Sequence, residues 1–202
     1  VYDGEELTTL RDRDYHRIRR RVGMLFQGAA LFDSLTVGEN VAYGLREHFS
    51  IGPRKMNKDE IIHRVATSLE LVGLPGIQEM APSDLSGGMK KRVGLARTIA
   101  LQPEVILYDE PTTGLDPVNT GRINHLIKGI SKALKITSIV VTHDMGTAFG
   151  VSDKLAFVFR GRILLHGPPA IFEASTDPNV HNFIKGIAPQ GEDVATLLSS
   201  AG

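Results

Sequence analysis

Two apolar runs of the sequence end in side chains that suit acid–base or metal chemistry. Asp109 and Glu110 follow "VILY", and His143 follows "SIVVT". In an open α/β sheet the ligand lies outside the carboxyl ends of the strands, so we expect these groups at one crevice. One of two adjacent carboxylates there can hold a divalent metal, and the other can orient or deprotonate an attacking water. The pattern therefore indicates metal-assisted phosphoryl chemistry.

A serine and two glycines ahead of a basic run form a second group of interest. The stretch "LSGGMKKRVG" places Ser86, Gly87 and Gly88 at the start of an expected helix. A helix start offers free N–H groups and a partial positive charge. Glycines let the backbone approach a ligand closely. The stretch is therefore suited to binding a phosphate group.

Taken one at a time, these groups also have plain structural interpretations. Ser86 can be an ordinary helix cap followed by flexible glycines. Asp109 and Glu110 can be a solvated loop start, and His143 can be a surface or core histidine. Gln27, after the apolar run "VGMLF", can be a polar strand end. Their spacing and order along the chain, rather than any single residue, favour a functional site.

The apolar periodicity predicts the elements that position these groups. Continuous apolar runs predict strands within 22–27, 104–110 and 135–144 and a hairpin over 154–167. Helical spacing predicts helices within 36–47, 57–73, 87–101, 115–134 and 145–152. The expected caps are Thr36 with Glu39, Asn57 with Glu60, and Asp116 ahead of Pro117. Strands alternating with helices imply a mostly parallel sheet that is buried on both faces.

The chain is interpreted as one domain over 1–202 whose core is split along the sequence. An α/β core takes 1–27 and 101–166, and a helical lobe takes 33–100. A tail over 167–202 carries short helices and a polar end that we expect to fray.

Composition narrows the class of protein. The 202 residues carry a formal net charge of +0 and are 42% hydrophobic, as in a folded globular protein. With no cysteine, a disulfide framework is excluded. No apolar run approaches the roughly 18 residues of a membrane span. The basic run Arg17, Arg19, Arg20 and Arg21 lacks interleaved aromatics, so it is interpreted as a solvated helix face or a neighbour of phosphate headgroups rather than a nucleic-acid groove.

Five motifs in one order resemble the ATP-binding subunit of ABC transporters. Gln27 matches the Q-loop, and Leu85–Met89 match the signature motif. The Walker B strand, D-loop and switch histidine are matched by Val105–Glu110, Gly114–Pro117 and His143. The resemblance covers nearly the whole chain. It implies the P-loop NTPase-like fold, with a mostly parallel α/β core, an inserted helical lobe and a short C-terminal helical tail.

The resemblance implies ATP as substrate and Mg²⁺ as cofactor, with roles assigned by matching position. Glu110 is then the general base on the hydrolytic water, and His143 stabilises the charge that develops on the γ-phosphate. Asp109 holds Mg²⁺. Gln27 contacts both the metal and the water, and so belongs to the catalytic and the metal-binding groups.

The resemblance also implies that two copies of the chain act together. In this family two subunits enclose two ATP molecules head to tail. Ser86, Gly87 and Gly88 would bind the γ-phosphate of an ATP held by the other copy, and Asp116 would couple the two sites. One chain therefore supplies only half of each site.

One motif of the family does not occur in the sequence. There is no GxxxxGK[ST] phosphate loop (Walker A), and no aromatic residue matches the one that stacks on adenine. Because "VYDGEEL" resembles the chain that follows this loop, we expect a strand–loop–helix unit, on the order of 30 residues, ahead of Val1. The 202-residue chain is expected to be inactive alone, and the full-length protein is expected to be an active ATPase.

Several stretches resemble one subgroup of the family, which powers phospholipid transport between membranes and maintains lipid asymmetry (Mla type). They are "FQGAALFDSLTVGENVAYGLRE", Met89 in the signature motif and the tail segment "DPNVHNFIKGIAPQG". The implied partners are a second copy, an integral-membrane permease, a small STAS-like subunit and a periplasmic lipid-binding protein, with no nucleic acid. The implied location is the cytoplasmic face of the inner (plasma) membrane, reached through the permease.

Other functions stay open at this point. One alternative is the ATPase of another ABC importer, for amino acids or osmolytes. If the phosphate loop is natively absent, the chain is a non-catalytic ABC-like binding subunit. ABC ATPases of DNA repair and chromosome organisation are disfavoured, because they carry coiled-coil or zinc insertions and this chain has no heptad run and no cysteine.

Overall fold

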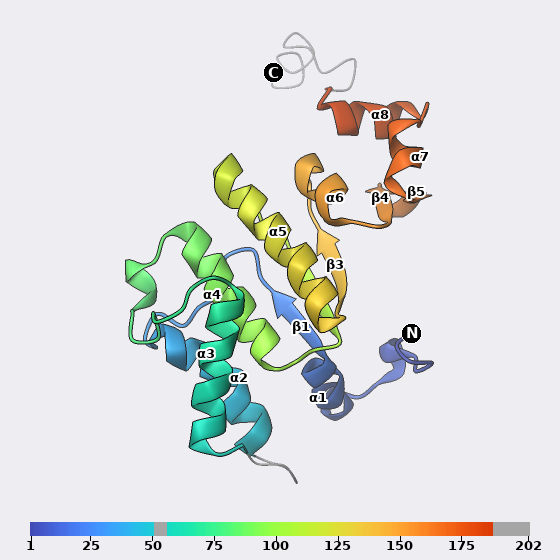
Figure 1. Ribbon diagram of the computed structural model, residues 1–202. Coiled ribbons are helices and arrows are strands. Elements are labelled where there is room, and N and C mark those ends of the chain that lie inside the picture. The colour runs from blue at the N-terminus through green and yellow to red at the C-terminus, as the bar shows by residue number, and fades with distance from the viewer. Residues whose placement is uncertain (51–55, 188–202) are drawn as a thin grey trace, which may run out of the picture. The chain divides into compact units, whose positions relative to one another are not determined.

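The computed structural model describes residues 1–50 and 56–187, which fall into two compact units, Val1–Thr147 and Ala148–Gly202. The first unit (Figure 1) begins with η1 (Leu7–Thr9), α1 (Asp12–Arg21), β1 (Val22–Leu25), α2 (Val37–Ser50), α3 (Lys58–Leu71), η2 (Pro82–Asp84) and α4 (Gly87–Ala100). It continues with β2 (Val105–Asp109), α5 (Pro117–Leu134), β3 (Thr137–Val141) and the start of α6 (Met145–Val151). The second unit holds β4 (Leu155–Phe159), β5 (Arg162–Gly167), α7 (Pro169–Glu173) and α8 (Pro178–Lys185).

The first unit is built on a parallel sheet with the strand order β1-β2-β3. The register pairs Leu25 with Tyr108, and Tyr108 with Val140. All three strands therefore end at the same edge of the sheet. This confirms the predicted parallel α/β core and brings the ends of the three strand-forming runs together.

The predicted capping boxes are confirmed at α2 and α3. Asn57 accepts a hydrogen bond from the Glu60 amide at 2.9 Å, and Glu60 accepts one from the Asn57 amide at 2.8 Å. Thr36 and Glu39 exchange the same pair of bonds ahead of α2, at 3.2 and 2.9 Å. These reciprocal bonds satisfy amides that the helix itself leaves without partners.

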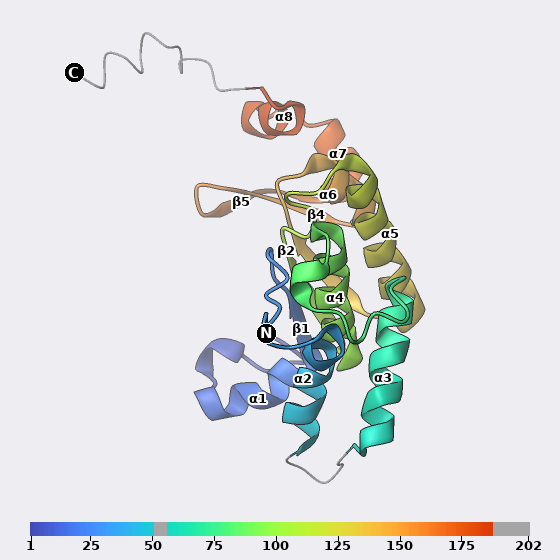
Figure 2. The same ribbon diagram turned by 90° about the vertical axis from the view of Figure 1, so that its left-hand side faces the viewer.

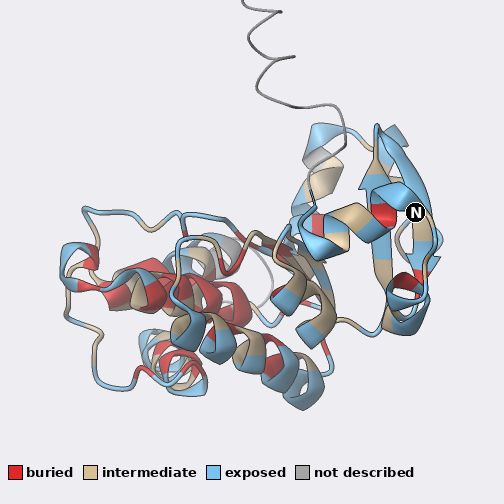
Figure 3. Cartoon of the chain, turned by 90° about the horizontal axis from the view of Figure 1, so that it is seen from above, coloured by how far each residue is buried: buried red, intermediate tan, exposed pale blue. Residues whose placement is uncertain are grey.

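The three long helices that follow β1 and precede β2 in the sequence pack together as one layer. α2, α3 and α4 pack against one another, and Figures 1 and 2 show them side by side. Val37, Val41 and Leu45, which lie at helical spacing along α2, are fully buried, and so is most of α4. Figure 3 shows the buried residues in red. This is the region assigned to the helical lobe.

Helix α4 lies close against β1 because both carry glycines at the contact. A Cβ at Gly23 would meet Thr98 Cγ2 at 2.5 Å, and one at Gly94 would meet Leu25 Cδ1 at 3.0 Å. Thr98 also donates a hydrogen bond to the Met24 carbonyl at 3.2 Å. The helix that begins at Ser86 is thus fixed directly to the strand that ends before Gln27.

The other face of the sheet is open. Met24, Leu107 and Ile139 form one row across the three strands, and Val141 lies on the same face. Ile139 and Val141 are 53% and 62% exposed, although both are β-branched apolar residues. Strand β3 has no hydrogen-bonded neighbour on its outer edge among the described residues. Since parallel sheets are normally covered on both faces, this face lacks a covering layer in the described chain.

The second unit contains the predicted hairpin. β4 and β5 are antiparallel and form a two-stranded sheet of their own, turned by Arg160 and Gly161 with positive φ values of 47° and 75°. Phe157 of β4 packs on Phe183 of α8, with ring centroids 5.1 Å apart. The short helices predicted in the tail are α7 and α8. The polar end, 188–202, lies outside the described residues, so its expected fraying stays a prediction.

The basic run near the start lies on and at the end of α1, and it is not a wholly solvated face. Arg17 forms an ion pair with Glu5. Arg21 binds both Glu104 oxygens, at 2.8 and 2.7 Å, and also pairs with Asp3. These contacts tie the start of the chain to the amino end of β2.

Within the described ranges, no helix has the length and apolar character to cross a membrane.

Candidate active site

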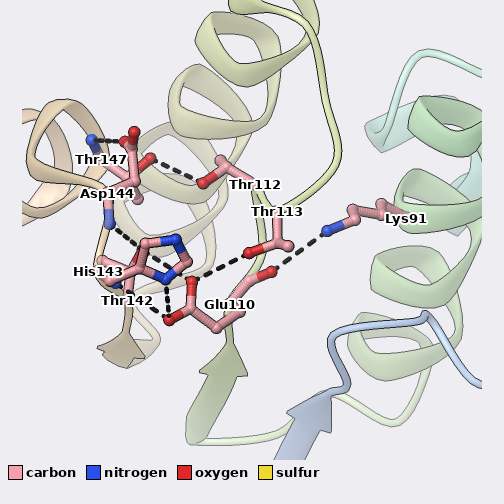
Figure 4. A network of polar contacts seen from close by, with 8 residues as sticks. All are labelled: Lys91, Glu110, Thr112, Thr113, Thr142, His143, Asp144 and Thr147. Carbon is pink, nitrogen blue, oxygen red and sulfur yellow. Dashed lines mark hydrogen bonds and ion pairs between the residues drawn. The ribbon is translucent and has the colours of Figure 1, made fainter. Parts of the chain in front are cut away.

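Glu110 and His143 meet at the carboxyl edge of the sheet, as their positions after two strands predicted. The Glu110 carboxylate accepts hydrogen bonds from the His143 ring Nδ1 at 2.8 Å and from the His143 amide at 3.0 Å. Thr113 and Thr142 donate to its other oxygen, at 3.1 and 3.2 Å (Figure 4). Because a carboxylate only accepts, these contacts place a proton on Nδ1 of His143.

The two partners differ in exposure. The Glu110 side chain is 18% exposed, whereas the His143 side chain is 70% exposed. The rest of the imidazole ring is therefore accessible to a ligand, while its Nδ1 is fixed by the carboxylate. An imidazole oriented in this way can act on a group that enters from solvent.

The backbone at Glu110 is held in an uncommon conformation. Its φ is +45°, in the left-handed region that residues with side chains seldom adopt. Its amide donates to the Val141 carbonyl at 2.9 Å, and its carbonyl accepts from Lys91 Nζ at 3.2 Å. Backbone strain of this kind, fixed by hydrogen bonds on both sides of the residue, is a recurring property of functional sites.

The surroundings of the Glu110 carboxyl change its pKa. Burial raises this pKa, but hydrogen bonds from His143, Thr113 and Thr142, together with the charge of His143, lower it by more. The net pKa lies below the usual value, so the group is ionised at neutral pH. A carboxyl of this kind stabilises the fold above its unfolded pKa of about 4.3, and the stabilisation is lost as the pH falls through the folded-state pKa.

We expect Thr113→Val to lower the free energy of unfolding by about 1 kcal/mol at pH 7, because one donor to an ionised carboxylate is removed. At pH values below the folded-state pKa of Glu110 the protonated carboxyl no longer needs this donor, and the difference from wild type should disappear. Urea denaturation at several pH values measures both, with Thr113→Ser, which keeps the donor, as control. An equal loss at acid and neutral pH would mean that Thr113 acts by packing instead.

Asp109 and Gln27 lie at the same edge of the sheet. Asp109 is the last residue of β2, on the open face, and Gln27 follows the end of β1 by two residues. Neither side chain has a hydrogen-bond partner among the described residues. Carboxylate and amide oxygens are ligands that Mg²⁺ prefers, and the ion usually keeps several waters, so the donor set fits this metal. No group of three or more His, Cys, Asp and Glu side chains suited to a metal occurs in the part of the chain described.

The serine–glycine stretch forms a separate group with the start of α5. Ser86 caps α4 by accepting from the Met89 amide at 3.2 Å. A Cβ at Gly88 would lie 3.3 Å from the side chain of Asn119, which also bonds Asp116. Asp116 caps α5 through the Asn119 amide at 2.9 Å, as predicted. The four residues Ser86, Gly87, Gly88 and Asp116 are therefore on or beside two neighbouring helix starts.

The same contacts affect the Asp116 carboxyl. Hydrogen bonds from the Asn119 amide and then from the Asn119 side chain lower its pKa, so it is ionised in this cap. A negative charge at a helix start is favoured by the helix dipole.

Three residues of the site were missed from the sequence: Lys91, Thr113 and Thr142. Thr113 and Thr142 are ordinary loop residues whose role depends on how β2 and β3 pair. The position of Lys91 could have been noticed in the sequence, because the residue lies four positions before Leu95 and therefore on the same, buried face of α4. Burial lowers the Lys91 pKa, and the Glu110 charge raises it in part. A lysine on the apolar face of a helix needs a partner, and here the partner is the Glu110 carbonyl.

A parallel α/β sheet with an acid–base pair at its carboxyl edge, together with a glycine-rich helix start, is typical of proteins that bind phosphorylated ligands. The ABC transporter family profile matches residues 1–113. The chain belongs to the ABC transporter family, whose members hydrolyse ATP, as the five motifs predicted.

Two curated relatives differ in what their names say they transport. The chain is 38% identical over 206 residues to the intermembrane phospholipid transport system ATP-binding protein MlaF of Escherichia coli (strain K12), covering 98% of this chain and 75% of that protein. It is 38% identical over 207 residues to the probable ribonucleotide transport ATP-binding protein mkl of Mycobacterium leprae, covering 100% of this chain and 58% of that protein.

A solved structure has the same fold. The dimeric structure of the ATP-binding cassette MJ0796, in a post-hydrolysis state with ADP and Pi, matches with a TM-score of 0.72 and 30% identity, over 82% of this chain and 71% of that one. The fold class predicted from the sequence is confirmed.

Proposed function

We propose that the chain is the ATP-hydrolysing subunit of an ABC transporter that moves phospholipid between membranes, with Glu110 as its general base. The observation that carries the proposal is the Glu110–His143 contact of 2.8 Å at the carboxyl edge of the sheet. Glu110 is ionised there, which is the form that can accept a proton from water, and donors from three residues hold its carboxylate in place.

His143 completes the acid–base pair. With Nδ1 held by Glu110, the exposed part of its ring faces outward to a terminal phosphate brought to the strand ends. Its imidazole then stabilises the charge that grows on the phosphate oxygens during transfer.

Mg²⁺, when bound, neutralises charge on the β- and γ-phosphates. Asp109 and Gln27 are the residues that would hold it. Both residues lie at the same edge of the sheet and have no hydrogen-bond partner among the described residues, which supports the assignment. Gln27 also has the amide groups needed to orient a water beside the Glu110 carboxylate.

The other half of the site belongs to a second copy of the chain. Ser86, Gly87 and Gly88 present a hydroxyl and free amides at the start of α4, and they bind the terminal phosphate of the ATP held by the partner. Asp116, next to them through Asn119, couples the two sites. The dimeric cassette MJ0796 with ADP and Pi is a relative that supports this arrangement.

We expect Ser86→Asp to fold as stably as wild type but to lose ATP turnover, because aspartate caps a helix as well as serine but repels phosphate. Ser86→Ala should lose about 1 kcal/mol of stability as well as turnover, since its cap is gone. Steady-state ATPase assays and urea denaturation of the full-length protein measure the two effects. Wild-type turnover in Ser86→Asp would leave Ser86 as a helix cap only.

The membrane permease docks next to the site. Phe32 and Tyr43 are both part-exposed, with ring centroids 4.7 Å apart, and Phe26 is exposed beside Gln27. Arg97 holds the loop between them by donating to the Ala29 and Ala30 carbonyls at 2.7 Å. An exposed aromatic cluster on a fixed loop suits a short cytoplasmic helix of the permease.

The remaining partners follow from the same assignment. They are a small STAS-like subunit and a periplasmic lipid-binding protein. The complex lies at the cytoplasmic face of the inner membrane, which the chain reaches through its permease. Purification of the full-length protein from native membranes tests this. Recovery with a permease and bound phospholipid is expected, and recovery with no membrane partner would remove the transport assignment.

A ribonucleotide transporter is the second candidate, because the mkl relative is equally similar at 38% identity. The purified complex in detergent separates the two. Stimulation of ATP hydrolysis by added phospholipid, but not by added ribonucleotides other than ATP and ADP, supports the first assignment. A chain that natively lacks the phosphate loop would instead be a binding subunit, and sequencing ahead of Val1 decides this.

A further inference from the structure

Lys91 connects the helix that carries the serine–glycine stretch to the backbone of the proposed general base. Its side chain extends from α4 to the start of the loop after β2, where Nζ donates to the Glu110 carbonyl at 3.2 Å (Figure 4). Lys91 is only 6% exposed, so its ammonium group is largely withdrawn from water. An isolated buried ammonium is costly, and a carbonyl dipole offsets only part of the cost.

We propose that Lys91 is a positioning residue for Glu110, which keeps the peptide after the base in the orientation that points the carboxylate at the attacking water. The proposal rests on the function assigned to Glu110. Lys91 does not touch the reacting atoms, and it acts only through the Glu110 backbone.

The left-handed backbone at Glu110 explains why a positioning contact is needed. A φ of +45° is unfavourable for a residue with a side chain, which is more stable at a negative φ. The Glu110 amide is held by Val141 at 2.9 Å, and Lys91 holds the carbonyl on the other side. If the carbonyl were released, the residue could rotate and the carboxylate would leave the hydrogen bonds to His143 and Thr142.

The same contact connects the proposed base to the half-site through one helix. Ser86 caps α4, and Lys91 follows it by five residues, about 7.5 Å along one helix. Lys91 therefore joins the helix of the half-site to the backbone of Glu110 in the same chain.

The test compares Lys91→Met with Lys91→Arg and Lys90→Met in the full-length protein. Methionine fills the buried space without an N–H donor, and arginine keeps a charged donor. Lys90→Met makes the same substitution at the neighbouring position of α4, which has no described contact with Glu110. We expect Lys91→Met to lower kcat for ATP about 10- to 100-fold, because a small misplacement of a reacting group has this effect.

The split between kcat and KM distinguishes positioning from a structural role. For Lys91→Met we expect KM for ATP within about twofold of wild type, with most of kcat recovered in Lys91→Arg and an unchanged kcat in Lys90→Met. A Lys91→Met protein with wild-type kcat would overturn the proposal. So would a loss of kcat that follows only the loss of folded protein in thermal denaturation.

Measuring the effect of Lys91→Met in a protein that also carries Glu110→Gln distinguishes failure of this proposal from failure of the proposed function. If Glu110 is the base, Lys91→Met should not lower the residual rate further in that background, because the two residues act through one group. Full activity in Glu110→Gln alone would reject Glu110 as the base. Loss of activity in Glu110→Gln, with wild-type kcat in Lys91→Met, would reject only the role of Lys91.

Discussion

We expect full-length Glu110→Gln protein to bind ATP and to stay closed with its partner copy, but to hydrolyse ATP about 100- to 10,000-fold more slowly than wild type. Glutamine has nearly the shape of glutamate but cannot take a proton from water. The loss should appear in kcat, because the contacts that bind ATP do not involve this side chain. Single-turnover hydrolysis with radiolabelled ATP measures the rate, and size-exclusion chromatography with ATP measures the closed dimer.

The structure gives a matched control for this substitution. Glu104 is a second carboxylate beside β2, but it lies before the strand and binds Arg21 at 2.8 Å, away from the catalytic edge. Glu104→Gln removes the same charge and should keep the wild-type rate. Hydrolysis by Glu110→Gln at the wild-type rate would show that another group deprotonates the water.

The second large effect concerns binding of ATP by the 202-residue chain alone. We expect its affinity for ATP to be at least about a hundredfold weaker than that of a protein that also carries a GxxxxGK[ST] strand–loop–helix ahead of Val1. Several charge-assisted hydrogen bonds to phosphate come from such a loop, each contributing about 1.5–3 kcal/mol. Within the described residues the buried lysine, Lys91, is already bound to a carbonyl and does not replace the lysine of the loop.

The open face of the sheet gives this prediction a structural readout. Ile139 and Val141 are exposed beside the unpaired edge of β3, where a further strand and helix can pack. The longer protein should protect the β3 amides from hydrogen exchange, and the 202-residue chain should not. Isothermal titration with ATP measures the affinity, with circular dichroism as the control for folding. Micromolar affinity in the 202-residue chain would contradict the prediction.

Most helices and strands could be predicted from capping residues and apolar periodicity in the sequence. Asn57 with Glu60 and Asp116 with Pro117 are capping patterns, and each begins a helix where it was expected. The apolar runs ending at Asp109 and before His143 became neighbouring parallel strands. These features depend on residues close in sequence, so periodicity and capping are enough to predict them.

Contacts between distant residues could not be predicted in the same way. The bonds from Lys91 and Thr142 to Glu110 join residues 19 and 32 positions apart, and they depend on the register of β2 and β3 and on how α4 packs. The sequence also gave no sign that Arg21 would pair with Glu104, because charge spacing along the chain does not report proximity across a sheet. Hydrogen bonds of this kind follow from tertiary packing.

The left-handed backbone at Glu110 also sets two contributions to stability against each other at this position. Glycine or asparagine would adopt a φ of +45° with less strain, but neither carries the ionised carboxylate that accepts four hydrogen bonds here. The proposed role as general base adds a requirement that glycine and asparagine do not meet. In a library randomised at this single position, selection for stability should show which of the two contributions is larger, and selection for turnover should retain glutamate.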